Sequence, residues 1–229
     1  MMDDNRSFMK VIARIQSPFP SKFGIPHQSG CIESIESRIV FEPEYRNPDA
    51  VRGLEKFDYI WLIWEFSETI RKDFSPTVRP PRLGGNERVG VFASRSPYRP
   101  NPIGLSSVRL LRVEQTKTEG PVLVVSGADL MAGTPIYDIK PYIRTDIHTD
   151  VRCGFTDERE MPHLQVFFPE ELKRKLPGEL VPGLCEVLAR DPRPRYQHDP
   201  ERVYGMPFDR FDVRFRVEGD TLTVVEVVQ

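Results

Sequence analysis

Proline restricts this chain more than any other residue does, because 22 of its 229 residues are proline. A proline ring fixes one backbone dihedral angle and removes an N–H donor, so it interrupts helices and central strands. The segments between the prolines are nonetheless regularly patterned, with alternating or continuous apolar residues. Such a chain favours short strands that are joined by structured loops.

Alternating and β-branched segments in the first two thirds of the sequence predict strands. The predicted strands span residues 9–15, 31–41, 57–66, 88–93, 104–114, 121–128 and 135–142. Residues 57–66 are apolar on both faces, which predicts a central strand. Asn47 followed by Pro48 predicts the start of a short helix that ends near Leu54, because asparagine caps helices and proline suits their first position.

The composition and the patterning of the sequence change after Tyr142. Residues 144–160 are polar and irregular, and short helices are expected over residues 169–176 and 182–190. Residues 211–217 alternate strictly, and the chain returns over residues 222–228, which predicts a hairpin. The sequence therefore predicts a mainly β protein, with a single-domain β-barrel core over residues 1–145 and a smaller C-terminal α+β domain over residues 146–229.

The cysteines and the apolar segments indicate where the protein works. Cys31, Cys153 and Cys185 are widely spaced and form no C-x-x-C pair, which argues against a disulfide framework and favours a reducing compartment. The N-terminal residues are polar, so no signal peptide is expected. The longest apolar run, residues 59–64, is too short to span a bilayer. We therefore expect a cytoplasmic protein without a membrane partner.

Arginine and proline are concentrated in one stretch. The net charge of the whole chain is −2, but residues 79–109 hold six arginines and a single acid, Glu87, which gives this stretch a net charge of +5. The arginines are Arg79, Arg82, Arg88, Arg95, Arg99 and Arg109. Neighbouring prolines limit where each guanidinium points, and a guanidinium fits phosphate or carboxylate through two hydrogen bonds. Any single arginine could be merely solvated, but the whole cluster predicts a site for an anionic ligand such as a phosphodiester backbone.

Other chemistry has little support in the sequence. Leu83-Gly84-Gly85-Asn86 lacks the spacing of a dinucleotide or triphosphate motif and predicts a tight turn. Asp146, His148 and Asp150 alternate as metal ligands on a strand can, but a solvated polar loop is the favoured interpretation, and no metal is predicted. No G-x-S-x-G motif is present.

Six motifs then identify a family resemblance. They are RPPRLGGN at residues 79–86, GVFASRSPYRPNPIGLS at 90–106, DLMAGTPIYDIKPY at 129–142, KFGIPHQ at 22–28, VRGLEKFDYIWLI at 51–63 and DPRPRYQ at 191–197. In this order, and over essentially the whole chain, they resemble the signature of the TrmO family, also called TsaA-like or YaeB-like. The resemblance implies a β-barrel tRNA methyltransferase, usually a homodimer, that uses S-adenosylmethionine. Its implied target is N6 of N6-threonylcarbamoyladenosine at position 37, next to the anticodon.

The resemblance also implies which residues contact the cofactor. They are Ser29, Gly30, Cys31, Ser67, Glu68, Arg95, Leu105, Ser126, Gly127, Ala128 and Asp129. Three positions depart from the family pattern: His27 stands where arginine is common, Ser67 where histidine is frequent, and Ala132 where many members have an acid.

A substrate hypothesis follows for the arginine cluster. We expect Arg95 and Arg99 to bind the threonyl carboxylate or an adjacent phosphate, with Tyr98 beside them. Arg79, Arg82 and Arg88 are expected to follow the backbone of the anticodon loop. Asp138 and Asp129 are candidate general bases, because the target nitrogen is a poor nucleophile until its proton leaves. For Asp138, a carboxylate that caps a loop is the favoured alternative.

The aromatic residues and the activity itself leave alternatives open. Tyr98, Tyr137 and Tyr142 could stack on a splayed base or pack against the barrel, whereas Trp61 and Trp64 are expected in the core or at a dimer interface. The rivals to a tRNA methyltransferase are a non-catalytic RNA-binding module and a methyltransferase for small molecules.

Overall fold

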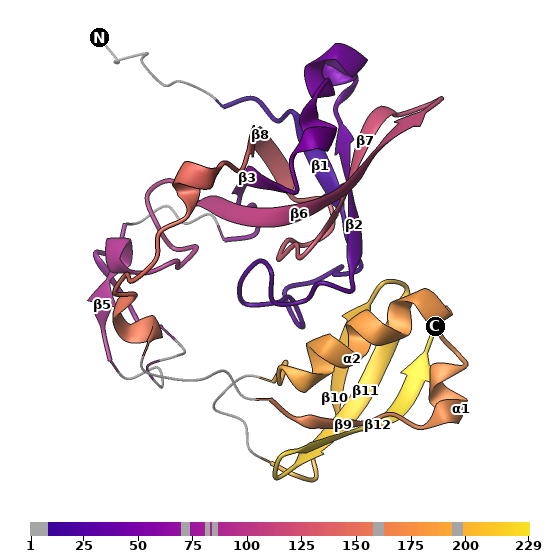
Figure 1. The fold of residues 1–229 in the computed structure, drawn as a ribbon. Coiled ribbons are helices and arrows are strands. Elements are labelled where there is room, and N and C mark those ends of the chain that lie inside the picture. The colour runs from indigo at the N-terminus through magenta and orange to yellow at the C-terminus, as the bar shows by residue number, and fades with distance from the viewer. Residues whose placement is uncertain (1–8, 70–73, 81–82, 84–86, 158–162, 194–198) are drawn as a thin grey trace.

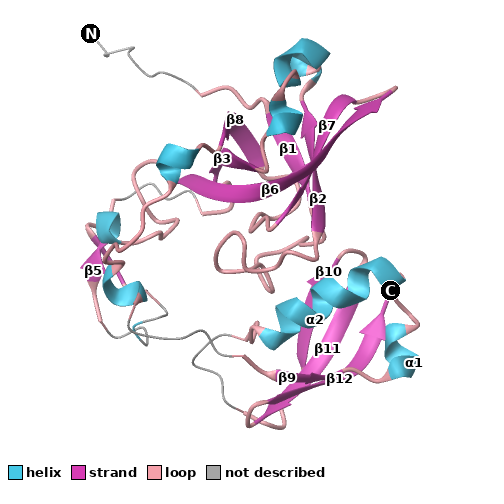
Figure 2. Ribbon diagram, in the orientation of Figure 1, coloured by secondary structure: helices cyan, strands magenta, loops and turns pink. Residues whose placement is uncertain are grey.

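The centre of the N-terminal part is a closed barrel (Figures 1 and 2). The computed structural model describes residues 9–69, 74–80, 83, 87–157, 163–193 and 199–229. The barrel strands are β1 (Ala13–Gln16), β2 (Glu36–Phe41), β3 (Tyr59–Glu65), β6 (Ile103–Thr116), β7 (Gly120–Ser126) and β8 (Pro135–Pro141). They close in the order β1-β2-β7-β6-β3-β8, and each neighbouring pair is antiparallel. The predicted β-barrel fold class is confirmed.

Strand periodicity fills the barrel interior. On β3, Ile60, Leu62 and Trp64 point inward and are buried, because successive side chains of a strand point to opposite faces. The outward residues of β3 are covered only in part, and Tyr59 keeps 38% of its surface exposed. The strand is central, as predicted, because it pairs with β6 and β8, and its outward Trp61 contacts Tyr142 and Asp146.

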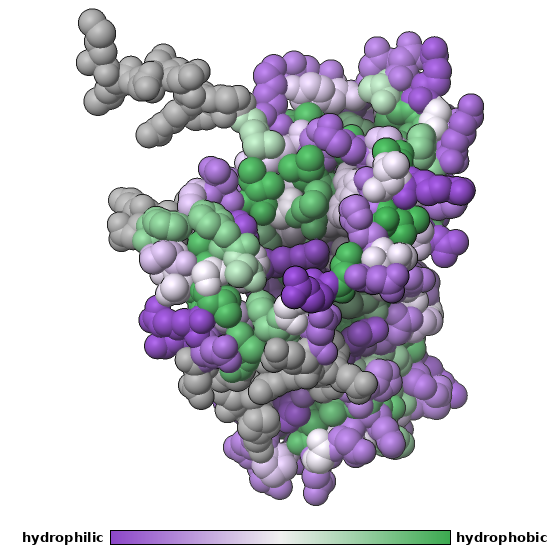
Figure 3. Space-filling model, turned by 60° about the vertical axis from the view of Figure 1, so that its left-hand side comes forward, coloured by the Kyte–Doolittle hydropathy of each residue, from purple (hydrophilic) through white to green (hydrophobic). Residues whose placement is uncertain are grey.

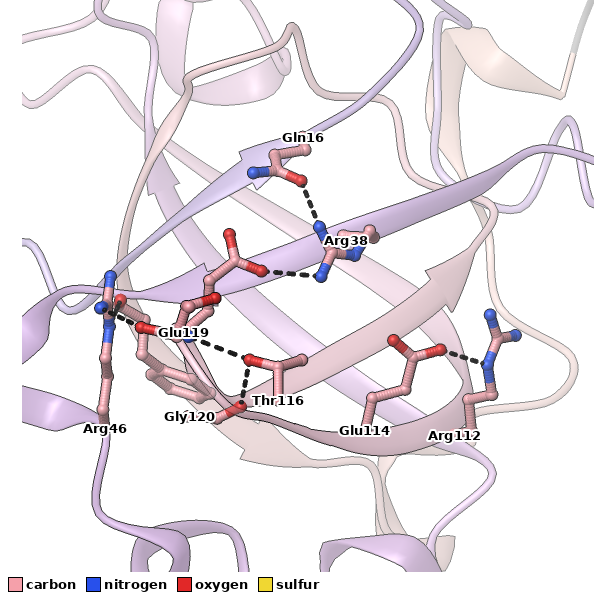
Figure 4. Close-up of polar contacts among 10 residues, drawn as sticks. Gln16, Arg38, Arg46, Arg112, Glu114, Thr116, Glu119 and Gly120 are labelled. Carbon is pink, nitrogen blue, oxygen red and sulfur yellow. Dashed lines mark hydrogen bonds and ion pairs between the residues drawn. The ribbon is translucent and has the colours of Figure 1, made fainter.

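Polar contacts hold the outside of the barrel wall together (Figure 4). Arg38 on β2 donates to Gln16 on β1 at 2.8 Å and to Glu119, in the turn between β6 and β7, at 2.8 Å. Thr116 accepts from the Glu119 amide and donates to the Gly120 carbonyl, which fixes that turn. These contacts tie β2 to β1 and to the turn between β6 and β7.

The C-terminal part is a separate sheet with helices beside it (Figure 2). Strands β10 (Tyr204–Phe208), β11 (Phe211–Glu218) and β12 (Thr221–Val228) are antiparallel, and β9 (Gln165–Phe167) joins β12 in parallel. The helices are α1 (Glu170–Lys173) and α2 (Val181–Ala189). The predicted hairpin and both short helices are confirmed. None of the helices in the described residues is long and apolar enough to cross a membrane.

Several local expectations differ from the structure. Residues 31–35 are irregular, and the helix expected over residues 47–54 is instead the 3-10 turns Pro48–Val51 and Leu54–Lys56, which Gly53 separates at a φ of +90°. The strand expected over residues 88–93 is only β5 (Val89–Gly90), which pairs with an unpredicted β4 (Thr77–Val78). Strands β9 and β10 were also not predicted, because short strands carry little periodicity.

The loop that follows β1 packs into the C-terminal core. Phe19, Ile32 and Ile35 are buried in the same apolar cluster as β10, β11 and α2. Phe19 meets Phe208 edge to face, with ring centroids 5.7 Å apart, and the Asp209 amide donates to the Pro18 carbonyl at 2.6 Å. The division at residues 145 and 146 stays a prediction, but the core of the C-terminal sheet includes side chains from the N-terminal segment.

Truncation of Phe19 tests this shared core. Phe19→Ala is expected to lower the free energy of unfolding by about 3–5 kcal/mol, because a buried aromatic ring is removed and leaves a cavity. Urea denaturation followed by far-ultraviolet circular dichroism measures the change. An unchanged midpoint would mean that the loop contributes nothing to the stability of the C-terminal sheet.

Candidate active site

Two of the predicted cofactor segments touch at one end of the barrel. The Gly30 amide donates to the Gly127 carbonyl at 2.8 Å. Gly127 follows the last residue of β7, and its φ of +77° is a conformation that favours glycine. A Cβ on Gly127 would also lie 3.2 Å from the Cα and the nitrogen of Gly30. The close approach of the two backbones therefore depends on glycine.

Two side chains bring further segments to the same place. Lys22 donates to the carbonyl of Glu68 at 2.9 Å, which joins the loop after β1 to the residues after β3. Arg95 donates from Nη1 to Oε1 of Gln28. The predicted residues Ser29, Gly30, Glu68, Arg95 and Gly127 thus belong to segments that converge, although they are as far as 98 residues apart in the sequence.

A chain of buried hydrogen bonds ends on Asp129. Trp64 Nε1 donates to Ser106 Oγ at 2.9 Å, and that hydroxyl donates to Asp129 Oδ1 at 2.6 Å. The residues Trp64 and Ser106 are both buried, on β3 and β6. Ser106 was not among the residues predicted from the sequence, although a serine at an inward position of an apolar strand is a signal that could have found it. The chain fixes the orientation of the Asp129 carboxylate.

Burial raises the pKa of the Asp129 carboxyl above its ordinary value. The hydrogen bond from Ser106, a bond from the backbone of Asp129 itself, the positive charge of Arg95 and the Ser29 amide act in the opposite direction. The increase in pKa that desolvation causes is larger than the decrease that these four interactions cause together. The site therefore holds a carboxylate that is costly to ionise and that is matched to a nearby positive charge.

The raised pKa predicts how stability depends on pH. Because the folded protein binds this proton more tightly than the unfolded chain does, the contribution of Asp129 to stability is present at low pH and is lost as pH rises through the folded pKa. Asp129→Asn should therefore raise the melting temperature at pH 7, and the gain should shrink as pH falls toward about 3.9, the ordinary pKa of aspartate. Thermal melts of both proteins across pH test this. A variant that is less stable than the parent at pH 7 would contradict it.

The arginines that are predicted to bind the substrate have different surroundings in the structure. Arg99 donates to the carbonyls of Ser94 and Ser96 at 3.0 and 3.4 Å, so it holds its own loop together. Arg79 and Arg88 are exposed beside the paired strands β4 and β5, and Tyr98 is 40% exposed. Arg82 lies outside the described residues. The substrate roles of all of these residues stay predictions.

The second candidate base has a different environment. Asp138, on β8, forms an ion pair with Lys140 at 3.0 Å, and its other oxygen accepts from the Ile139 amide at 2.9 Å. These contacts suit the structural alternative that the sequence analysis favoured, a carboxylate that caps its own backbone. Asp129 accepts from the Ser29 amide and lies within the electrostatic influence of Arg95.

The tyrosine of β8 and the tyrosine that follows this strand have different surroundings. Tyr142 contacts Trp61, with ring centroids 5.3 Å apart, and also Tyr59 at 6.2 Å. Burial, together with a hydrogen bond to Glu65, raises the pKa of Tyr137 to about 12. The ring contacts of Tyr142 suit the packing alternative, whereas the choice for Tyr137 stays a prediction. Trp61 donates to Asp146 at 2.9 Å.

The remaining residues predicted to contact the cofactor have different surroundings. Ser126 and Ala128 are buried beside Gly127, whereas Ser67 is exposed just after β3, and Leu105 is 56% exposed on the outer face of β6. Cys31 instead lines a cavity of about 420 Å3 with Cys185 and Arg190 of the C-terminal part. Among the residues whose positions are described, no group of three His, Cys, Asp or Glu side chains could hold a metal ion.

Known proteins match both parts of this chain. Residues 14–147 match the model of the tRNA-methyltransferase O N-terminal domain, and residues 161–229 match the TrmO C-terminal domain. A protein of Escherichia coli K12 named tRNA (adenine(37)-N6)-methyltransferase is 39% identical over 90% of this chain and 91% of its own length. A protein of the same name from Eikenella corrodens is 45% identical over 75% of this chain and 97% of its own length.

A solved structure has the same fold. The crystal structure of TrmO from Pseudomonas aeruginosa is 30% identical and covers 97% of this chain and 98% of the solved chain, with a TM-score of 0.79. The family models together match well over half of the chain, and the E. coli relative is aligned over nearly its whole length. This chain therefore belongs to the tRNA-methyltransferase O (TrmO) family.

Proposed function

We propose that this protein is an S-adenosylmethionine-dependent methyltransferase that methylates N6 of the adenine at position 37 of tRNA. The observation that carries the proposal is the convergence of Ser29, Gly30, Arg95, Gly127 and Asp129 at one end of the barrel. Both relatives described above carry the name of this activity, and each is matched over more than nine tenths of its length. That agreement favours an enzyme over a non-catalytic RNA-binding module.

The residues at this end of the barrel fit the proposed methyl donor. S-adenosylmethionine has a positively charged sulfur, and when bound it supplies an electrophilic methyl group. Asp129 offers a desolvated carboxylate, which attracts a cation more strongly than an exposed one does. A Cβ on Gly30 would meet no atom within 4 Å, so open space lies beside the point where the Gly30 and Gly127 backbones meet, and exposed Leu105 offers apolar surface on β6.

Position and charge are what this chain contributes to the reaction. The methyl group and the target nitrogen must be held in line, and correct positioning can contribute about 7–11 kcal/mol to a barrier reduction. Arg95 has N–H groups beyond the one that it donates to Gln28, and these can hold the threonyl carboxylate of N6-threonylcarbamoyladenosine. We assign to Asp129 the acceptance of the proton of the target nitrogen, a role that its raised pKa supports because it makes this carboxylate a better base than an ordinary aspartate.

Nucleoside mass spectrometry tests the proposal directly. The protein is incubated with S-adenosylmethionine and with tRNA that carries N6-threonylcarbamoyladenosine, or with tRNA that lacks this modification. We expect one added methyl group on the modified nucleoside alone. Methylation of small molecules without any methylation of tRNA would favour the small-molecule alternative.

A thermal-shift titration tests the cofactor separately. A ligand that binds only the folded state raises the melting temperature as its concentration increases. We expect such a rise with S-adenosylmethionine, and no rise at millimolar concentration would contradict the proposed cofactor. The homodimer and the cytoplasmic location stay predictions of the family resemblance and of the sequence.

A further inference from the structure

Two exposed phenylalanine rings are stacked beside the paired strands β4 and β5. Phe74 precedes β4 and Phe92 follows β5, and their ring centroids lie 6.4 Å apart with an angle of 25° between the planes. The exposed fractions of these residues are 57% and 72%. The two strands lie outside the closed barrel, as an antiparallel pair in which Thr77 faces Gly90 and Val78 faces Val89.

The outward position of Phe92 is imposed by its neighbours. Val91 is buried, and its amide donates to the Pro76 carbonyl at 2.9 Å. Ser94 closes the 3-10 turn Val91–Ala93 by donating from its hydroxyl to the Val91 carbonyl at 2.8 Å. Because this turn is anchored at Val91, the next side chain is directed to solvent. A stacked apolar pair that the fold holds in water indicates a binding surface.

Positive charge lies next to these rings. Arg79 and Arg88 directly follow and precede the paired residues Val78 and Val89, both are exposed, and Arg88 donates to Thr77 at 2.8 Å. Residues 74–99 contain five arginines and one acid, Glu87, a net charge of +4. Figure 3, which turns this side of the molecule toward the viewer, shows hydrophobic and strongly hydrophilic residues next to one another on it.

This combination fits single-stranded nucleic acid. Aromatic rings stack on unpaired bases while cationic side chains bind the adjacent phosphates. The excess of positive charge beside the rings favours an anionic partner of this kind over an apolar contact with a second copy. We propose that Phe74 and Phe92 form a stacking platform for an unpaired base of the tRNA anticodon loop, with Arg79 and Arg88 on neighbouring phosphates. The proposal rests on the proposed function for its choice of RNA.

Equilibrium binding of a fluorescent anticodon stem-loop tests the platform. We expect Phe92→Ala to weaken the Kd about 5- to 100-fold, which is the effect of losing one base–aromatic stack. Its dependence on salt should match that of the parent, whereas Arg88→Ala should reduce the salt slope by about one because a phosphate contact is lost. Phe92→Trp should retain affinity, since indole also stacks. Phe167→Ala removes another phenylalanine, 60% exposed on β9, and serves as the matched control with parental affinity.

Two results would overturn the proposal. One is a Kd for Phe92→Ala within twofold of the parent. The other is a parent that sediments as a dimer and a Phe92→Ala variant that sediments as a monomer with parental affinity for each site, which would assign the rings to a contact between copies. The binding assay does not depend on methyl transfer, so a parent that binds tRNA without methylating it would refute the proposed function alone. An unchanged thermal shift with S-adenosylmethionine shows that each variant keeps its cofactor site.

Discussion

Arg95→Ala is expected to lower methyl transfer to tRNA by roughly 10²- to 10³-fold, the usual cost of removing one well-placed donor from an active site. The guanidinium is exposed, is held by Gln28, and acts on the charge of Asp129. Its removal therefore takes away both an anion-binding group and the neighbouring charge that favours ionisation of Asp129. Single-turnover kinetics with saturating cofactor measure the loss in the chemical step.

The same substitution should move the pH profile. Arg95 lowers the pKa of Asp129, so its removal lets that pKa rise further. If Asp129 accepts the proton, the rate of Arg95→Ala should reach its plateau at a higher pH than the rate of the parent does. Arg214→Ala is the matched control, because it removes an arginine that pairs with Asp212 and Glu226 on the C-terminal sheet. We expect the control to keep parental activity within about twofold, or about 0.4 kcal/mol in the barrier, and an Arg95→Ala variant that behaves like the control would remove Arg95 from the mechanism.

Gly104→Ala is expected to damage both stability and activity through one side chain. A Cβ on Gly104 would lie 2.2–2.6 Å from three ring atoms of Trp64, far inside van der Waals contact. The indole must then move, although it is buried and packs on Phe66 with ring centroids 4.3 Å apart. We expect the free energy of unfolding to fall by about 1–3 kcal/mol, the cost of overpacking a core.

Activity should fall with it, because the displaced indole can no longer donate to Ser106 and hold Asp129 in place. Urea denaturation measures the first effect, and methyl transfer at a temperature where the variant is fully folded measures the second. Gly178→Ala serves as the control, since a Cβ there meets no atom within 4 Å, and its stability should stay within about 0.5 kcal/mol of the parent. Parental stability and parental activity of Gly104→Ala together would show that the position of Trp64 does not matter.

Strands could be predicted wherever apolar and polar residues alternate over a long enough segment. β3, β6, β7 and the β11–β12 hairpin all appear within about three residues of their predicted bounds, because a buried interior and an exposed surface impose a period of two on every strand. Strands β4, β5 and β9 have only two or three residues. Segments this short are set by partners elsewhere in the chain, so local pattern could not define them.

Some residues of the candidate site could likewise be predicted from the sequence, and others could not. Arg95 and Asp129 could be predicted as site residues, because they lie in motifs that resemble those of the family and because their side chains are charged. Ser106 carried only a weak signal in the sequence, a serine at an inward position of an apolar strand, because its role depends on β6 placing its hydroxyl between Trp64 and Asp129. The participation of Phe19 in the C-terminal core was equally hidden, since its partner Phe208 lies 189 residues away.

By itself, the amino-acid sequence determined that this chain forms short strands, that its arginines gather among prolines, and that it belongs with the TrmO proteins, because residue type, spacing and local backbone restriction are properties of neighbours along the chain. The tertiary structure alone decided which carboxylate is desolvated, which arginine acts on its charge, and which phenylalanines stay exposed. Burial and charge pairing depend on distances through space, and those distances exist only once the barrel has closed.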